Sequence, residues 1–450
     1  MPVNIQFWEQ IITDERLYDE EPPEKDKTIR TEFEKDHDRI IFSNYFRRLH
    51  EKTQVFPYSP MSTSNLARSR LAHSLEVSCA GRTLGNTLGV YLSGNGVKIN
   101  PYYPGMIVSS GCLAHDIGNP PFGHSGEYAI QHWMSNNITA LPLDDWEMSD
   151  LLNYEGNAQG FRILTRLENW QRAGGLRLTI STIASFIKYP SSSLKNNSKK
   201  KFGFFKEDYP SFKQLYTQLN FKENGEKSYP RYPLTYLSEA ADDICYAIID
   251  MEDAYHLDLI SFADYYDLLM PIASRNKGFS DKKDYDREIR IARLRSAAIN
   301  VLIEQSMAVY ISNIENIQSL NKIDSLINSI ESNNEYKSIV NFSIENIYST
   351  NRVLEIECAG FQAIGGLFDI FIPAVLDKSG SGKKNALCRK LIPEVYFKRI
   401  NQYNDISWEK DIELNTYQQI LSVCDYICGM TDSFAIELYQ RLSGIKLPVY

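Results

Sequence analysis

Apolar residues recur at helical spacing through much of this 450-residue chain, whereas the alternating pattern of β-strands is sparse. The clearest example is the segment LTYLSEAADDICYAIIDMEDAY, 234–255. Its apolar residues follow 4-3-4-3 spacing, which puts them on one helix face: Leu237, Ala241, Ile244, Ile248 and Met251. Helical patterns also cover 66–92, 234–270, 290–332 and 353–375. The sequence therefore predicts an all-α fold, with few short strands, for which 98–108 and 390–399 are the candidates.

The length of the chain allows a large hydrophobic core, and the hydrophobic fraction of 43% is typical of globular proteins. Two polar stretches predict loops, SSSLKNNSKKK at 191–201 and DKSGSGKKN at 377–385, but neither is long enough to force a domain boundary. We expect a helical core over residues 1–280 and a C-terminal helical portion over 281–450 packed against it.

Several classes of protein are disfavoured by composition. The seven cysteines form no CxxC pair, which is typical of reduced thiols in a cytoplasm. The N-terminal residues MPVNIQFWEQ do not resemble a signal peptide, and no stretch approaches about 20 uninterrupted apolar residues, so we expect no membrane span. A net charge of −9 argues against broad coating of nucleic acid but allows a local basic patch.

The segment CLAHDIGNPPFGHSGE, 112–127, gathers groups that bind metals or transfer protons. We expect a helix to run through the His115–Asp116 dipeptide, to be capped at Gly118, and to stop at the following Asn-Pro-Pro. A helix C-terminus favours a cation. Taken alone, a His-Asp dipeptide is more typical of a surface aspartate beside a core histidine.

Two other helical segments contribute similar residues. His73 lies within RSRLAHSLEVSCAGRTLG, 68–85. Asp242, Tyr246 and Asp250 follow i, i+4, i+8 spacing beside the apolar stripe of 234–255. Two acids and a tyrosine next to a core stripe indicate the lining of a cleft, although an ordinary polar edge is the alternative.

The ordered set His73, His115–Asp116 and Asp242 resembles the HD superfamily of metal-dependent phosphohydrolases. Further segments are similar to one branch, the deoxyguanosinetriphosphate triphosphohydrolase (dGTPase) family: DRIIFSNYFRRLHEKTQVFP (38–57), RLAHSLEV (70–77), LAHDIGNPPFGHSGE (113–127), EGNAQGFRIL (155–164), KYP (188–190), EAADDICYAIIDMED (239–253) and DYICGMTDSFA (425–435). The resembling segments are spread over most of the chain, in the family's order.

Two imidazoles and two carboxylates form a mixed nitrogen and oxygen ligand set, which suits Mn, Fe, Co, Ni or Zn and suits Mg less well. Only one such set is present, so we expect one divalent transition metal per chain, with Mn first. The resemblance assigns the metal ligands as His73, His115, Asp116 and Asp242, and it assigns His124 and Glu127 as the catalytic pair.

The resemblance also implies contacts with a nucleotide. Lys188 and Tyr189 would bind the triphosphate, and Arg47 would meet phosphate, although paired arginines on a helix more often form salt bridges. Tyr246, Asp250 and Gln54 would contact the phosphate and the sugar, with Tyr246 crowding a 2′-hydroxyl. Glu357 is the candidate for guanine recognition.

The resemblance implies hydrolysis of deoxynucleoside triphosphates, dGTP first, by a cytoplasmic homo-oligomer, a hexamer or tetramer, that responds to a nucleotide effector. Two alternatives stay open. One is an HD phosphohydrolase that acts on another nucleotide phosphate ester. The other is a regulator with weak turnover that binds nucleotides or single-stranded nucleic acid through the loop Lys195–Lys201.

Overall fold

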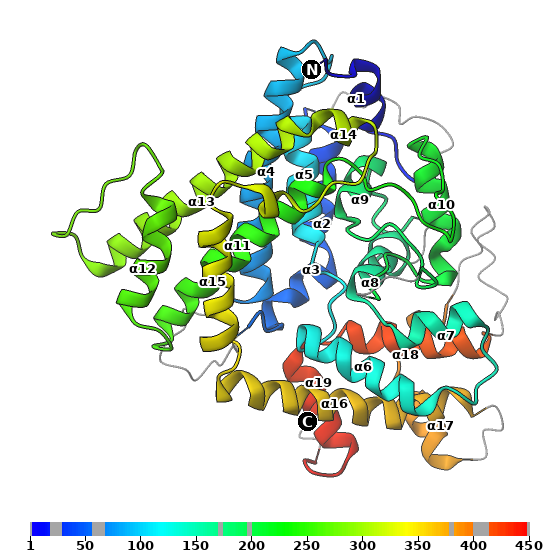
Figure 1. Cartoon of the computed structure of the whole chain (residues 1–450). Helices are drawn as coiled ribbons and strands as arrows, with labels where there is room; N and C mark the ends of the chain where they lie inside the picture. Colours follow the sequence, from blue (N-terminus) through cyan, green and yellow to red (C-terminus); the bar gives the residue numbers. More distant parts are fainter. Residues whose placement is uncertain are drawn as a thin grey trace.

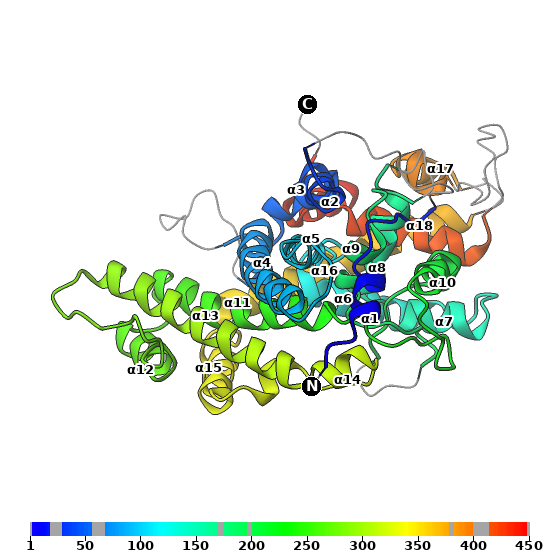
Figure 2. The ribbon, with the colours of Figure 1, turned by 90° about the horizontal axis from the view of Figure 1, so that it is seen from above.

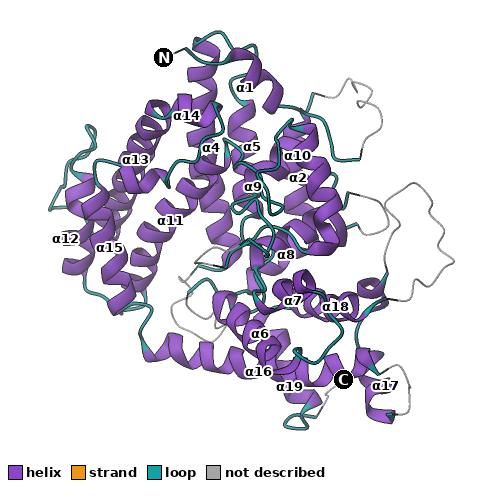
Figure 3. Cartoon of the chain, turned by 45° about the vertical axis from the view of Figure 1, so that its right-hand side comes forward, coloured by secondary structure: helices purple, strands orange, loops and turns teal. Residues whose placement is uncertain are grey.

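The computed structural model describes residues 2–18, 29–55, 68–169, 174–195, 200–377, 382–398 and 414–447. Within these ranges the chain is helical and has no β-strand, only isolated bridges such as that between Arg16 and Thr179 (Figure 3). The predicted all-α class is confirmed. The prediction of short strands in 98–108 and 390–399 is wrong. In the first segment, Pro104 lies in the first turn of a helix, and the second segment holds a 3-10 turn over Glu394–Phe397.

The helices carry the labels of Figure 1. The first ten are α1 Ile5–Ile11, α2 Glu32–Phe42, α3 Asn44–Arg48, α4 Arg70–Gly94, α5 Tyr103–Ala114, α6 Gly123–Asn137, α7 Asp145–Leu152, α8 Gly156–Arg162, α9 Ile180–Phe186 and α10 Tyr209–Gln218. The others are α11 Thr235–His256, α12 Phe262–Ala273, α13 Arg287–Ser312, α14 Ile314–Gln318, α15 Asn333–Asn346, α16 Asn351–Leu376, α17 Lys383–Arg389, α18 Thr416–Cys428 and α19 Asp432–Leu442.

The predicted helical pattern over 234–270 is divided into α11 and α12. Ser261 begins α12, because its hydroxyl accepts from the Asp264 amide while the Asp264 carboxylate accepts from the Ser261 amide. The pattern over 290–332 likewise becomes α13 and α14, followed by a 3-10 turn over Leu326–Ser329. The patterns over 66–92 and 353–375 correspond to α4 and α16.

Helices α4, α5 and α11 form the centre of the fold, with α12, α13 and α15 to one side (Figure 1). Close approach of α4 to the start of α5 depends on glycine. A Cβ atom on Gly89 would lie 1.9 Å from the carbonyl oxygen of Pro101, and one on Gly85 would lie 2.5 Å from that of Pro104. Helix α4 carries His73 and α5 leads into His115, so this close contact holds together the two helices that bear these residues.

The buried apolar residues form two clusters. The larger surrounds α4, α5, α11 and α13. The smaller joins α6 and α7 to α16, α18 and α19, which lie together below the central helices in Figure 1. The view from above shows the same α6 and α16 beneath α5 (Figure 2). The predicted boundary after residue 280 stays a prediction.

One helix in the described ranges, over Val353–Leu376 of α16, is long and apolar enough to cross a membrane by length and composition. Half of its most apolar window is buried. Ile364, Leu367 and Phe368 are fully enclosed in the smaller cluster, where the helix packs against α6, α18 and α19. Their burial identifies α16 as a helix of the protein core.

A buried ion pair joins α8 to α18. Arg162 is fully enclosed and donates from Nε to Oδ1 of Asp425 at 2.8 Å and from Nη2 to Oδ2 at 2.9 Å. Its Nη1 lies 2.9 Å from Glu207 and 3.1 Å from Asp208. Burial lowers the pKa of Arg162, but these carboxylates outweigh it and raise the pKa above its usual range.

We predict that Arg162→Ala strongly destabilises the fold. The substitution leaves Asp425 buried without its cation, whereas Asp208 keeps Arg166, and breaking a buried pair in this way typically costs about 3–5 kcal/mol. Urea-induced unfolding followed by circular dichroism measures the loss. The matched control is Arg275→Ala, which removes partly exposed ion pairs with Glu331 and Glu335 and should cost about 1 kcal/mol or less. Equal losses for the two variants would contradict the assignment.

Candidate active site

The turn after α5 begins earlier than the sequence predicts. The helix ends at Ala114, His115 is its C-cap, and residues 115–118 form turns, so Gly118 is not the cap. Gly118 instead packs against α8, where an added Cβ atom would lie 2.1 Å from both the carbonyl oxygen of Gly156 and the amide nitrogen of Gly160. This tertiary contact is not visible in the local sequence.

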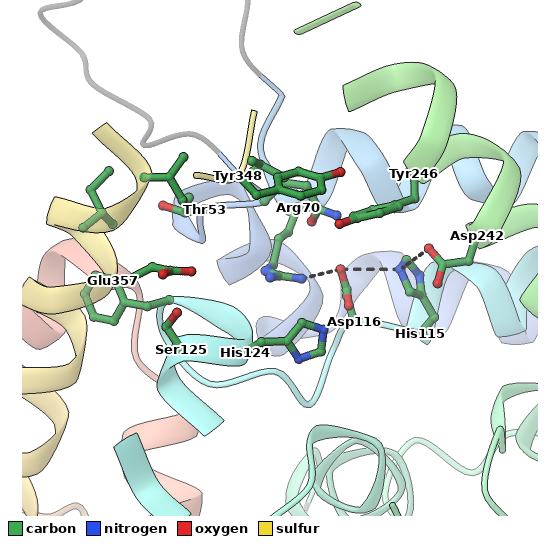
Figure 4. Close-up of a pocket in the computed structure, with 15 residues that line it drawn as sticks. Thr53, Arg70, His115, Asp116, His124, Ser125, Asp242, Tyr246, Tyr348 and Glu357 are labelled. Carbon is green, nitrogen blue, oxygen red and sulfur yellow. Dashed lines mark hydrogen bonds and ion pairs between the residues drawn. The ribbon is translucent and has the colours of Figure 1, made fainter. Parts of the chain in front are cut away.

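The four predicted metal ligands converge between α4, α5 and α11. Oδ1 of Asp242 lies 3.2 Å from Nε2 of His73 and 3.4 Å from Nε2 of His115. Nε2 of His115 also lies 3.4 Å from Oδ2 of Asp116. Ligand atoms of His73, His115 and Asp116 all lie within 4.8 Å of one another, a spacing compatible with one cation. Figure 4 shows His115, Asp116 and Asp242 of this group.

The imidazole orientations fit a metal site. Nδ1 of His115 lies 2.6 Å from the Cys112 carbonyl oxygen, to which it can donate, so Nε2 is left to face Asp242. Burial raises the pKa of Asp242, but the imidazoles of His115 and His73 outweigh it and lower the pKa to about 2. Conversely, burial lowers the pKa of His115, while Asp116 and Asp242 raise it to about 9. Two ionised carboxylates therefore surround the imidazole nitrogens, a donor set that suits a divalent cation.

Arg70 is a functional candidate that the sequence reasoning did not single out. Its buried guanidinium lies 2.6 Å from Oδ2 of Asp116, while Asn119 donates to Oδ1 of the same carboxylate at 2.5 Å. Burial raises the pKa of Asp116, but Arg70 and His115 hold it well below its usual range. The available signal was spacing, because Arg70 precedes His73 by three residues and therefore shares its helix face.

His124 and Glu127 form a pair at the start of α6, which begins at Gly123. Nδ1 of His124 lies 2.9 Å from Oε2 of Glu127, while Oε1 accepts from the Gly156 amide at 2.7 Å. The side chain of His124 is 73% exposed and that of Glu127 is 4% exposed, so the buried acid orients an accessible imidazole. This hydrogen bond raises the pKa of His124.

Lys201 approaches the same acid from the loop before α10. Its ammonium lies 2.6 Å from Oε2 of Glu155 and 3.5 Å from Oε2 of Glu127. Burial raises the pKa of Glu127, but His124 and Lys201 lower it overall. The sequence indicated a basic loop here but not its contact with the predicted catalytic pair.

A cavity of about 230 Å³ opens beside these groups. One wall carries the predicted metal ligands, another carries His124, and a third is formed by the start of α16 (Figure 4). The lining residues are Thr53, Gln54, Val55, Arg70, His115, Asp116, Phe122, His124, Ser125, Asp242, Tyr246, Tyr348, Val353, Ile356 and Glu357. Gln54, Tyr246 and Glu357, which were predicted to contact substrate, therefore share one cavity.

Tyr348 connects the cavity to Asp250 and was also absent from the predicted set. Its ring stacks on Tyr246 with centroids 5.7 Å apart, and its hydroxyl donates to Oδ2 of Asp250 at 2.7 Å. Burial raises the pKa of Asp250 to about 8, although the Tyr348 hydrogen bond opposes the rise. Asp250 thus lies behind the wall formed by Tyr348 and Tyr246.

Three predicted phosphate contacts lie outside this lining. Lys188 is 3.3 Å from Oε1 of Glu239 and 5.9 Å from the ring centroid of Tyr189. Burial lowers the pKa of Lys188, but Glu239 outweighs it and raises the pKa. Arg47 is exposed and donates to Oδ1 of Asn44 at 2.9 Å.

Comparison with known proteins gives full-length relatives. A deoxyguanosinetriphosphate triphosphohydrolase-like protein of Synechocystis sp. is 38% identical, covering 98% of this chain and 100% of that protein. One from Listeria monocytogenes is 31% identical, covering 98% of this chain and 100% of that protein. A deoxyguanosinetriphosphate triphosphohydrolase of Serratia proteamaculans is 28% identical, covering 94% of this chain and 96% of that protein. Residues 383–441 match the phosphohydrolase-associated domain.

We predict that Asp250 makes the metal-free protein less stable as pH rises. Its pKa is about 8 in the folded state against an ordinary value of 3.8, so between these values the folded state holds a proton that the unfolded state has released. With chelator present, the thermal midpoint should fall between about pH 5 and about pH 8, and fall less in Asp250→Asn. The neutral amide keeps an acceptor for Tyr348.

The control for this pH series is Asp267→Asn, an exposed acid on α12. It should reproduce the pH dependence of the unsubstituted protein. An Asp250→Asn profile that also matches the unsubstituted protein would contradict the raised pKa.

Proposed function

The chain belongs to the deoxyguanosinetriphosphate triphosphohydrolase family of HD phosphohydrolases, as predicted, and on that premise we propose that this hydrolase converts deoxynucleoside triphosphates, dGTP first, to the deoxynucleoside and inorganic triphosphate. The observation that carries the proposal is the meeting of two groups at one cavity. The ligand set of His115, Asp116 and Asp242 lies on one side, and the His124–Glu127 pair lies on the other.

We propose that one divalent transition metal binds His73, His115, Asp116 and Asp242. Mn is expected, with Fe, Co, Ni, Zn and Mg as alternatives. The fit rests on two converging imidazoles and two carboxylates that remain ionised. When bound, such a cation supplies Lewis-acid polarisation of a phosphate oxygen.

We propose that His124 donates a proton to the leaving group during hydrolysis. Its Nδ1 faces Glu127, which leaves Nε2 for a substrate in the cavity, and its raised pKa favours the protonated form. In the proposed reaction a water oxygen forms a bond to the α-phosphorus, and the bond from that phosphorus to the 5′-oxygen breaks. His124 gives a proton to the departing 5′-oxygen, while Glu127 orients the imidazole, and the attacking water releases a proton to solvent, from which His124 is protonated again.

The substrate contacts follow the cavity walls. Gln54 and Tyr246 would contact the deoxyribose. Asp250 would act on the 3′-hydroxyl through Tyr348, which donates a hydrogen bond to Asp250. Crowding by Tyr246 would disfavour ribonucleotides. Glu357, on the opposite wall at the start of α16, would read the base.

The triphosphate contacts remain proposals from the family. Lys188 and Tyr189 lie side by side on the loop after α9, from which they would reach the phosphates, and Arg47 is accessible to solvent. We further propose a cytoplasmic homo-oligomer, a hexamer or tetramer, that responds to a nucleotide effector. Part of the loop Lys195–Lys201, proposed to contact single-stranded nucleic acid, lies outside the described residues.

We predict one tightly held metal per chain. Asp116→Ala should abolish metal retention with little change in helical circular dichroism, because it removes a ligand at a turn. His124→Ala should retain the metal, because its imidazole faces Glu127 and lies outside the ligand group. Elemental analysis of the purified variants measures both. Two metals per chain, or retention by Asp116→Ala, would contradict the ligand assignment.

We predict that dGTP yields deoxyguanosine and tripolyphosphate, with ¹⁸O from labelled water recovered in the tripolyphosphate. His124→Ala should lower kcat about 10²–10⁴-fold while metal and substrate still bind. The control His132→Ala removes an exposed histidine of the same helix and should leave kcat unchanged. Mass spectrometry and phosphate analysis over dNTPs, NTPs and monophosphates measure the outcome.

Each other outcome of this substrate panel identifies an alternative. Orthophosphate or pyrophosphate as first product would exclude attack at the α-phosphorus. Turnover of monophosphates alone would indicate a phosphohydrolase for another ester, and binding without turnover would indicate a regulator. Equal turnover of GTP and dGTP would remove the proposed role of Tyr246.

A further inference from the structure

Asp432, the first residue of α19, contacts two segments of the site although it lines no part of the cavity. Its Oδ2 accepts from the Thr53 amide at 2.8 Å, and its Oδ1 accepts from the Phe122 amide at 2.9 Å. Thr53 precedes Gln54, and Phe122 is the N-cap of α6, two residues before His124. One buried carboxylate therefore joins the two segments that carry proposed site residues.

Phe122 needs this external contact. Its φ of +64° lies in the left-handed region, which is unfavourable for a bulky residue, and its side chain has no oxygen with which to cap α6. Asp432 supplies a carboxylate at that helix N-terminus, where negative charge is favourable. The strained residue is thus held by a group more than 300 positions later in the chain.

Gly360 on α16 completes the constraint on Phe122. A Cβ atom added to Gly360 would lie 2.4 Å from Cγ of the Phe122 ring, so the ring occupies the space that any larger residue would fill. The backbone of Phe122 is fixed by Asp432, and its side chain by α16. Together they set the direction in which α6 starts and hence the position of His124.

The buried ammonium of Lys52 provides a second connection between the same parts of the chain. It donates to the carbonyl oxygen of Asn119 at 2.6 Å and to that of Cys428 at 2.8 Å. Arg48 donates in addition to the Gly429 carbonyl oxygen at 2.9 Å. The segment from Cys428 to Asp432 is therefore fastened to the turn after Asp116 and to the residues before Gln54.

We infer that Asp432 is a positioning residue for hydrolysis, through which α19 fixes His124 relative to the segment of Gln54. This inference rests on the proposed function. It assigns a task to the matched phosphohydrolase-associated domain, 383–441, because its residue Asp432 fixes the main chain around the catalytic histidine. Small displacements of a catalytic group can cost about 10²-fold in rate, so the constraint acts on the chemical step.

The test compares Asp432→Asn with the unsubstituted enzyme. The asparagine side chain has one oxygen where the carboxylate has two, so one of the main-chain amides of Thr53 and Phe122 loses its acceptor. We expect kcat for dGTP to fall about 10–100-fold with metal content unchanged. The matched control is Glu437→Gln, an exposed acid on the same helix, which should leave kcat within about twofold of the unsubstituted value.

A double-mutant cycle with His124→Ala separates positioning from general damage. If Asp432 acts through His124, Asp432→Asn should lower kcat less than about twofold in the His124→Ala background. Equal losses in both backgrounds, or an unchanged kcat in Asp432→Asn alone, would overturn the inference. Absence of triphosphohydrolase activity in the unsubstituted protein would instead remove the proposed function.

Gly360→Ala provides an independent test of the inference if the Asp432→Asn variant does not fold. Alanine favours a helix over glycine, so the change does not weaken α16 itself, but its Cβ atom displaces Phe122. We expect a loss of kcat that again disappears in the His124→Ala background. A fully active Gly360→Ala enzyme would overturn the inference.

Discussion

The buried ion pair between Arg162 and Asp425 fixes α8 against α18, and the active site depends on the positions of both helices. The start of α8 supplies the Gly156 amide that binds Glu127, and the close contact of Gly160 with Gly118 sets the turn after Asp116. Helix α18 leads to Cys428, whose carbonyl oxygen accepts from Lys52. Buried charges are costly unless paired, so this arrangement tolerates few alternatives.

Electrostatics divide the cavity into two parts. Asp116 and Asp242 face cations or imidazoles, so their pKa values fall and they stay ionised. At Asp250, burial outweighs the Tyr348 hydrogen bond and the charge of Arg68, and the pKa rises to about 8. At neutral pH the first two attract a cation, while Asp250 is largely neutral and can donate as well as accept a hydrogen bond. One helix, α11, thus carries an ionised carboxylate and a largely neutral one two turns apart.

The sequence predicts those features that depend on local pattern or on ordered motifs. The all-α fold, the helices around 66–92 and 353–375, and the family follow from periodicity and from the segments containing His73, His115 and Asp242. The end of α5 at Ala114 could not be predicted, because it depends on the packing of Gly118 against α8. Tyr348 and Asp432 were likewise hidden, since each meets its partner across about 100 to 380 residues of chain.

The contacts of Asp432 also determine when the site can exist during protein synthesis. The predicted metal ligands and the His124–Glu127 pair lie before residue 251, yet the carboxylate that fixes Phe122 is made nearly 200 residues later. At about 5–20 residues per second, a ribosome needs about ten seconds or more to add that stretch. A nascent chain therefore carries every predicted metal ligand long before the main chain around Phe122 is fixed, so the mature geometry is reached only near the end of translation.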